Sequence, residues 1–326
     1  MFSHTSTFRG RAVPISHRLF YLLRVLLYAP ICITAVDALK GRYRVKSKRF
    51  VLLLNALTNG TNGKGLDWFN RIVIMYRRND TKQFDSSVYS LTTERGVDID
   101  SDLFLSLSNS LQLDGAIKIP KFLSTQDAVD LYTQVSLIPG STINREYECL
   151  KHWLDSNDNH PRFISHSSHL NKIPTIQQVA TNYLLQKIAR DYLGVPPLIV
   201  DIQSWTTTAT SDLSDYDLEQ AAMAFHCDSD YIKFLKVFIL LTDVTIDNGP
   251  FQFVVKSHRG RRHVAGRMPN SEIITPGDEI FNGTGKAGDL MIVDTRGWHK
   301  ANEVVLGHRT MLQLIYTSSF FGGQTA

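Results

Sequence analysis

The sequence has few cysteines. Its 326 residues include only Cys32, Cys149 and Cys227, which are odd in number and show no regular spacing. This scarcity argues against a disulfide-stabilised secreted module and against a cysteine-rich zinc module. It fits a reducing compartment, so we expect a cytoplasmic protein.

Acidic residues are nearly absent from the first 50 positions. Asp37 is the single acid there against ten Lys and Arg residues, so residues 1–50 carry a charge of +9 and the remainder of the chain carries −5. The main part of the chain is therefore not a basic nucleic-acid binder, and no nucleic-acid partner is expected. The basic terminus could contact an anionic surface.

The N-terminal region lacks a clean membrane span. Its apolar segment, residues 19–36, is interrupted by Arg24 and Pro30, and it is slightly short of the roughly 20 apolar residues that a spanning helix needs. Three alternatives remain open: a helix packed on the main domain, a membrane-surface helix with basic flanks, and a transmembrane anchor. Peripheral membrane contact through residues 19–49, and hence membrane association, is one of these alternatives.

No internal repeat or low-complexity tract divides the chain. We expect a basic, partly helical N-terminal region over residues 1–105, with helical spacing at Leu66 to Tyr76, and a main domain over residues 106–326. In the main domain, Ser124 is expected to cap a helix that continues to Val135.

A second helix and a series of strands are expected further along the main domain. Pro174 should begin one helix that ends at Gly194. Segments rich in β-branched residues then alternate with Gly, Asn and Pro turns: 198–208, 231–244, 251–255, 289–294 and 309–317. Many short strands preceded by helices predict a mainly β fold with supporting helices, namely a double-stranded β-helix, or jelly roll, of the cupin-like type.

Two ligand-type side chains alternate in an extended segment. In such a segment His226 and Asp228 project to one face while Cys227 projects to the other. His299, expected at the end of the strand 289–294, could supply a third ligand. Two histidines and one carboxylate form the facial triad of non-haem iron(II) oxygenases. The same residues could hold zinc for hydrolysis, and that alternative stays open.

An arginine follows the second histidine at a fixed spacing. Arg309 lies ten residues after His299, and a turn at Asn302 to Gly307 would fold the two flanking strands antiparallel. Arg309 would then reach the barrel interior near the metal. A buried guanidinium requires an anion, and the distal carboxylate of 2-oxoglutarate is a natural bidentate partner.

Together these motifs resemble the phytanoyl-CoA dioxygenase family of iron(II)- and 2-oxoglutarate-dependent oxygenases over residues 111–316. Besides the triad and Arg309, the resemblance rests on Asp114-Gly115, Ile119-Pro120, Phe122-Leu123, Leu240-Leu241-Thr242-Asp243, Asn248-Gly249-Pro250, Ser257-His258 and Gly288-Asp289-Leu290. It implies a double-stranded β-helix that uses Fe(2+), 2-oxoglutarate as cosubstrate, and O2.

The resemblance also implies roles for individual residues. Metal ligation falls on His226, Asp228 and His299, and 2-oxoglutarate binding falls on Arg309. Gln203 matches a strand position where related hydroxylases place a cosubstrate contact, and Thr207 follows on the same face of that strand. The expected reaction is hydroxylation of a small-molecule or lipid-like substrate with release of succinate and CO2.

Several alternatives remain at this stage. The chain could be a metal hydrolase on the same barrel, or a non-catalytic ligand-binding module derived from an oxygenase. The basic loop 258–263 could grip an acidic substrate or form a solvated hairpin, and the His-rich loop 152–169 could hold a second metal or be solvated. Trp205 and Trp298 could line a pocket or fill the core. Substrate identity and oligomeric state are not fixed by the sequence.

Overall fold

The computed structural model describes residues 64–77, 101–156, 158, 160–210, 222–228, 230–259 and 273–319. The apolar segment 19–36, the predicted membrane contact at 19–49 and residues 260–263 of the basic loop lie outside these described residues. Within the described ranges, no helix combines the length and apolarity that crossing a bilayer requires.

Helices dominate the first half of the described chain, and strands dominate the second. The helices are α4 (Lys64–Arg77), α5 (Ser101–Asp114), α6 (Thr125–Ser136), α7 (Leu150–Leu154), α8 (Ser167–Leu170), α9 (Pro174–Ala180) and α10 (Tyr183–Leu193), with 3-10 helices η1 (Ile246–Asn248) and η2 (Ser257–Arg259). The strands are β1 (Ala116–Ile119), β2 (Gly140–Ser141), β3 (Glu146–Tyr147), β4 (Arg162–Ser165), β5 (Leu198–Thr208), β6 (Phe234–Leu240), β7 (Phe251–Val254), β8 (Ile280–Asn282), β9 (Leu290–Val293), β10 (His299–Ala301) and β11 (His308–Thr317).

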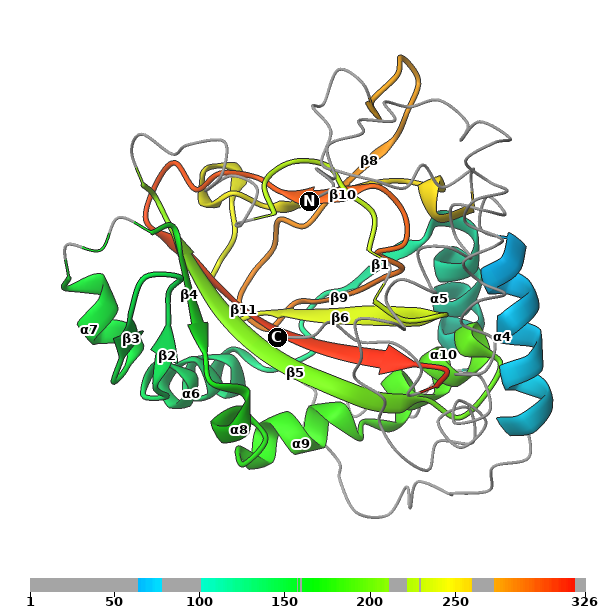
Figure 1. Ribbon diagram of the computed structural model, residues 1–326, viewed down its shortest axis with the longest axis horizontal. Coiled ribbons are helices and arrows are strands. Elements are labelled where there is room, and N and C mark those ends of the chain that lie inside the picture. Colours follow the sequence, from blue (N-terminus) through cyan, green and yellow to red (C-terminus); the bar gives the residue numbers. More distant parts are fainter. Residues whose placement is uncertain are drawn as a thin grey trace, which may run out of the picture.

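The described strands form two antiparallel sheets. The large sheet has the order β1-β9-β6-β11-β5-β4-β2-β3, and the small sheet has the order β10-β7-β8. Figure 1 shows α6, α9 and α10 along one side of the large sheet, with β8 and β10 on its other side. The predicted mainly β jelly roll with supporting helices is confirmed.

Strand alternation sends apolar side chains to both faces of the large sheet. In β9, Leu290 and Ile292 belong to the core beneath the helices, whereas Met291 and Val293 belong to the core beneath the small sheet. Both faces are therefore covered, which explains why β6 and β9 are almost uniformly apolar and do not alternate between apolar and polar residues.

The long helix predicted from Pro174 to Gly194 is wrong in one respect, because the chain forms two helices there. Asn182 separates the two helices, α9 and α10. Its side chain accepts a hydrogen bond from the backbone N–H of Leu185 at 3.3 Å and thereby caps α10. A local cap thus overrides a continuous apolar period. The predicted end is confirmed, since Gly194 adopts a left-handed conformation with φ +78°. The cap at Ser124 is confirmed as well.

The expectation that the His-rich segment 152–169 is a loop is also wrong. The segment contains the end of α7, β4 and most of α8, and β4 pairs with β5 in the large sheet. Its apolar residues explain this ordering: Phe163 and Trp153 are buried and their rings stack at 5.5 Å. The many polar residues around Phe163 and Trp153 were the reason for predicting a loop.

Helices of the predicted N-terminal region pack on the main domain. The helix expected at Leu66 to Tyr76 is confirmed as α4, whose Ile74 packs against the main core. Arg77 donates hydrogen bonds to the backbone carbonyls of Pro196, at 3.0 Å, and of Ser318. The next helix, α5, continues from residue 101 to residue 114, across the predicted boundary at 105/106.

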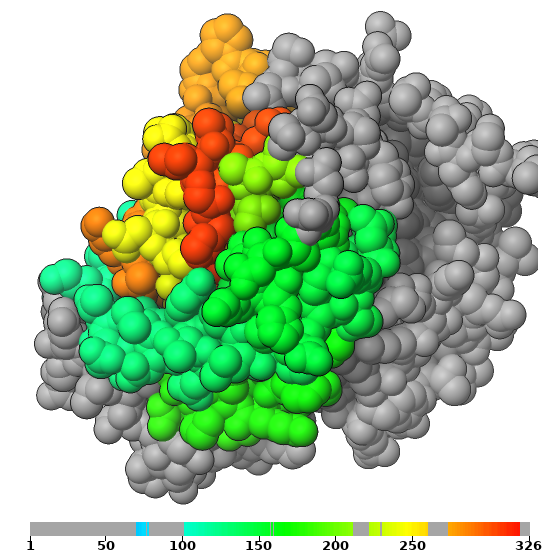
Figure 2. Space-filling model, turned by 90° about the vertical axis from the view of Figure 1, so that its left-hand side faces the viewer, coloured from blue at the N-terminus to red at the C-terminus, as the bar shows by residue number. Residues whose placement is uncertain are grey.

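The turn predicted at residues 302–307 does not pair its flanking strands. Strand β10 lies in the small sheet and β11 in the large one, so the loop crosses between sheets. Figure 2 shows this loop between the β6–β7 connection and the end of β5. Backbone hydrogen bonds fix it there, from Val305 to Asp247 at 2.8 Å and from Ala209 to Gly307 at 3.1 Å.

Candidate functional site

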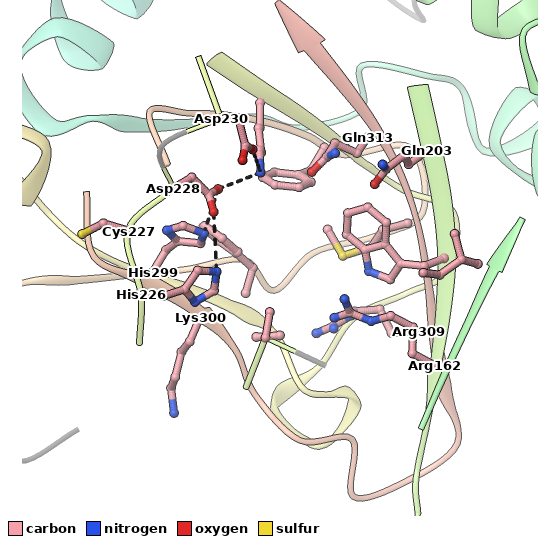
Figure 3. Close-up of a pocket in the computed structure, with 18 residues that line it drawn as sticks. Arg162, Gln203, His226, Cys227, Asp228, Asp230, His299, Lys300, Arg309 and Gln313 are labelled. Carbon is pink, nitrogen blue, oxygen red and sulfur yellow. Dashed lines mark hydrogen bonds and ion pairs between the residues drawn. The ribbon is translucent and has the colours of Figure 1, made fainter. Parts of the chain in front are cut away.

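A cavity of about 440 Å³ opens between the two sheets. Its walls come from β4, β5, β6, β7, β10 and β11 and from the segment that precedes β6. Figure 3 shows that His226, Asp228 and His299 lie on one side of this cavity, while Arg162, Arg309 and Gln203 project from the opposite side.

The three predicted ligand residues converge. The Nε2 atom of His226 lies 3.7 Å from Oδ1 of Asp228, and Nε2 of His299 lies 3.3 Å from Oδ2 of the same carboxylate. One ligand atom from each residue lies within 4.8 Å of the other two. Reciprocal backbone hydrogen bonds of 2.9 and 3.0 Å between His226 and His299 hold the two imidazoles side by side.

Backbone carbonyls fix the tautomers of both imidazoles. The Nδ1 atom of His226 lies 2.9 Å from the carbonyl oxygen of Ala224, and Nδ1 of His299 lies 3.0 Å from that of Gly297. A carbonyl only accepts, so each Nδ1 carries a proton. When the imidazoles are neutral, as metal ligation requires, each Nε2 then has its lone pair available beside Asp228. Two neutral imidazoles and a carboxylate arranged in this way fit a divalent ion such as iron(II).

The structure agrees with the prediction for Cys227 and disagrees with it for the strand that holds His299. Cys227 points away from the pair that it separates, as predicted (Figure 3). His299, however, does not end the strand at 289–294. It begins β10 in the other sheet, after a turn at 294–297 that redirects the chain.

Lys236 is a charged neighbour of the triad that the sequence analysis missed. Its ammonium lies 2.7 Å from Asp228 and 3.2 Å from Asp230. Burial acts to raise the pKa of Asp228, but the positive charge of Lys236 is the largest opposing effect, and the pKa lies well below its usual range. A lysine within the otherwise apolar strand β6 was the available signal.

Arg309 is buried without an anion. It is 1% exposed, and its Nε and Nη1 atoms have no hydrogen-bond partner among the described residues. Burial, together with the charge of Arg162, lowers the pKa of Arg309 to about 9. A buried guanidinium in this state is a strong candidate for binding a carboxylate.

Three neighbouring strands place a row of donors beside Arg309. Thr207 of β5 is the register partner of Arg309 in β11 and of Arg162 in β4. Register partners project to the same face of a sheet. The Oγ1 atom of Thr207 is also buried without a partner in the described structure. The sequence analysis missed Arg162, because its segment was expected to be a loop.

The remaining candidates divide between the cavity and the surrounding structure. Gln203 lines the cavity and donates a hydrogen bond of 2.9 Å to Asp201, whereas Thr207 is not among the lining residues. Trp205 lines the cavity beneath the guanidinium of Arg162, which lies 5.5 Å from its ring centre. Trp298 does not line it.

The two basic or histidine-rich segments contribute no second site in the described residues. His258 and Arg259 contact the backbone carbonyl of Gln112 at the end of α5 and do not line the cavity. His166 pairs with Glu146 at 2.8 Å. Across the residues that the structure describes, His226, Asp228 and His299 are the one group of His, Cys, Asp or Glu with metal-binding geometry.

Comparisons with solved structures find similar folds at low sequence identity. They include the non-heme alpha ketoglutarate dependent epimerase SnoN from nogalamycin biosynthesis (17% identity, 67% of this chain and 82% of that chain, TM-score 0.46). EvdO2 from Micromonospora carbonacea var. aurantiaca is 15% identical over 67% of this chain and 91% of that one, with TM-score 0.47. A 2OG-Fe(II) oxygenase family oxidoreductase from Burkholderia pseudomallei is 14% identical over 68% and 94%, with TM-score 0.45.

Comparison with curated proteins gives no match. Comparison with family models gives one match, in which residues 111–305 fit the model of phytanoyl-CoA dioxygenase (PhyH). This match covers more than half of the sequence and includes all three residues of the triad. The chain therefore belongs to the phytanoyl-CoA dioxygenase family of iron(II)- and 2-oxoglutarate-dependent oxygenases.

Proposed function

We propose that this protein is an iron(II)- and 2-oxoglutarate-dependent dioxygenase that hydroxylates a small-molecule or lipid-like substrate and releases succinate and CO2. One observation carries the proposal: the His-Asp-His group and an anion-free buried arginine face the same cavity from opposite sides. That pairing suits a ligand that chelates a metal at one end and carries a carboxylate at the other.

His226, Asp228 and His299 are the residues that would hold the iron. With only three ligands from the protein, a bound iron would have room for the oxo acid and dioxygen and would supply the oxidising chemistry. The hydrogen bonds from Nδ1 of the two histidines favour the neutral tautomer in which Nε2 is the ligand atom.

Arg309 would bind the distal carboxylate of 2-oxoglutarate. Its Nε and Nη1 donors are buried and unpaired, so an incoming carboxylate removes an electrostatic penalty as well as forming charge-assisted hydrogen bonds. Arg162, in the same row of register partners, adds positive charge beside that carboxylate, and Thr207 lies between the two arginines in that row without lining the cavity. Gln203 on the same wall is a further candidate for cosubstrate contact.

The same arginine weighs against the two alternatives. A metal hydrolase needs a metal and water, and it gives no reason for burying a guanidinium without an anion. Against a non-catalytic binding module stands the intact His-Asp-His group, which such a module does not need. Hydroxylation is favoured over halogenation because Asp228 supplies a carboxylate where halogenation requires space for a halide.

Anaerobic titration with iron(II) and then 2-oxoglutarate tests the proposal. We expect a visible charge-transfer band that appears only when both are present, in the wild type but not in His299→Ala. With oxygen admitted, a substrate screen should show succinate release and a product that has gained one oxygen atom. Folded wild-type protein that binds iron but develops no band with 2-oxoglutarate contradicts the proposal.

A further inference from the structure

One buried amide of the cavity has no partner among the described residues. Gln313 of β11 is 5% exposed and lines the cavity. Its side chain makes no hydrogen bond with any residue that the structure describes. Burying an amide without a hydrogen bond is costly, because the group loses the water that it would bind on the surface. The side chain is therefore a candidate for binding a ligand.

Strand alternation directs Gln313 into the cavity. Its neighbours Leu312 and Leu314 belong to the core beneath the helices. Gln313 consequently projects to the other face of the large sheet, as Met311 and Arg309 do on the same strand. Figure 3 shows the amide of Gln313 within the group of residues that line the cavity.

The neighbouring amide shows what a satisfied glutamine looks like at this position. Gln203 of β5 is the register partner of Gln313 and lines the same cavity. It donates a hydrogen bond of 2.9 Å to Asp201. The protein thus supplies a partner for the amide of Gln203, whereas none of the described residues does the same for Gln313.

Gln313 lies away from the arginine that would hold the cosubstrate. Arg309 and Gln313 are both on β11, and their spacing along the strand places their Cα atoms about 13 Å apart. Figure 3 shows the two side chains at different ends of the cavity, with Arg162 beside Arg309 and Gln203 beside Gln313. A cosubstrate that spans the triad and Arg309 leaves the amide end for the primary substrate.

Aromatic rings surround the amide end of the cavity. Phe238 of β6 is the second register partner of Gln313. The centre of its ring lies 5.3 Å from that of Phe251 and 6.2 Å from that of Trp205. All three rings line the cavity, and aromatic faces and edges favour contact with a flat apolar group.

The charges at this end are already balanced. Lys236 precedes Phe238 on the same face of β6, and its ammonium lies 2.7 Å from Asp228 and 3.2 Å from Asp230. An amide both donates and accepts, so it suits a neutral partner. We propose that Gln313 binds a neutral hydroxyl, carbonyl or amide group, attached to a planar apolar body, of the primary substrate; this rests on the proposed function of the triad and Arg309.

Benzamide and toluene are a matched pair of probes for this subsite. Both carry the same ring, but only benzamide has a polar group for Gln313. With protein loaded with Ni2+ and 2-oxoglutarate, we expect saturable binding of benzamide to the wild type and at least fivefold weaker binding to Gln313→Met, because one hydrogen bond is lost. Toluene should bind the wild type and Gln313→Met with nearly equal affinity.

Gln186→Met is the control variant, because it changes a buried glutamine that has a partner. Gln186 of α10 is 6% exposed, does not line the cavity, and donates a hydrogen bond of 2.7 Å to the carbonyl of Ala180. Its benzamide affinity should equal that of the wild type, while its ligand-free melting temperature should fall. The melting temperature of Gln313→Met should not fall, because no described hydrogen bond within the protein is lost.

Three results would overturn the subsite. They are the absence of saturable benzamide binding to the wild type, equal benzamide affinities in the wild type and Gln313→Met, and a melting temperature that falls as far in Gln313→Met as in Gln186→Met. Weaker 2-oxoglutarate binding by Gln313→Met would also count against it, because the amide would then serve the cosubstrate. Wild-type protein that does not bind 2-oxoglutarate refutes the role of the triad and Arg309 before benzamide is added, so the two proposals fail separately.

Discussion

Lys236 and Asp228 form an ion pair on the wall of the cavity, with 2.7 Å between Nζ and Oδ2. The side chains are 12% and 11% exposed, so water screens the pair weakly. Asp230 shares the same ammonium at 3.2 Å. A divalent ion bound by Asp228 would therefore share that carboxylate with a lysine, and the lysine balances two carboxylates when no ion is bound.

Replacing Lys236 with methionine should destabilise the metal-free protein by about 3–5 kcal/mol, because two buried carboxylates lose their cation. A divalent ion should then restore the charge balance. We expect Ni2+ to raise the melting temperature more in Lys236→Met than in the wild type, since an ion that binds only the folded state stabilises it in proportion to its affinity.

Lys286→Met is the control for this comparison. Lys286 pairs with Asp243 at 2.7 Å on the surface, with side chains 81% and 53% exposed, and exposed pairs contribute about 0–1 kcal/mol. Both melting temperatures of this variant, with and without Ni2+, should stay near those of the wild type. An equal metal-induced gain in Lys236→Met and the wild type would contradict the predicted competition for Asp228.

Arg309→Met should separate stability from cosubstrate binding. Removing a buried guanidinium that lacks an anion should stabilise the ligand-free protein by about 1 kcal/mol or more in urea unfolding. The same change should weaken 2-oxoglutarate binding by about 100-fold or more, because two charge-assisted hydrogen bonds disappear.

The oxo acid 2-oxopentanoate, which lacks the distal carboxylate, is the matched ligand for this variant. Its affinity in the presence of Ni2+ should be nearly the same in the wild type and Arg309→Met, because it cannot use the arginine. Parallel losses for both oxo acids would mean that Arg309 supports the cavity wall and does not bind a carboxylate.

The sequence was informative where chemistry follows from local geometry. The period of an extended chain placed His226 and Asp228 together, and β-branched composition located β5 and β11 to within one residue. Ser124 and Gly194 marked helix ends because a cap and a left-handed residue each act within one turn.

The sequence was uninformative where register between distant strands decides contacts. Arg162 joins Arg309 only because β4 and β11 flank β5 with Thr207 as common partner, and no local pattern encodes that register. The pairing of Lys236 with Asp228 likewise depends on the path of the segment before β6. These contacts are tertiary, so composition and periodicity could not reveal them.

Gly194→Ala should destabilise the protein through backbone strain and a close contact. Gly194 has φ +78°, and an added Cβ would lie 3.0 Å from Cδ1 of Ile74 on α4. The left-handed conformation costs an L-residue about 1–2 kcal/mol. Gly277 has φ +98° with nothing within 4 Å of an added Cβ, so Gly277→Ala reports strain alone. The loss in urea unfolding should be larger for Gly194→Ala than for Gly277→Ala, and the reverse order would contradict the docking of α4 on α10.

Asp158 should stabilise the fold only while it is ionised. Its carboxylate accepts hydrogen bonds from Tyr147 at 2.7 Å and Thr142 at 2.8 Å, next to the chain that leads into β4. Burial acts to raise its pKa, but these hydrogen bonds outweigh burial and lower the pKa below its ordinary value of 3.8. A depressed folded-state pKa means that the stabilisation is complete above the unfolded-state value and disappears as the pH falls through the folded-state value.

Asp158→Asn should therefore be less stable than the wild type at pH 7, and the two urea unfolding free energies should converge below about pH 3. A difference that instead grows toward acid pH would show that the carboxylate is not stabilised in the folded state.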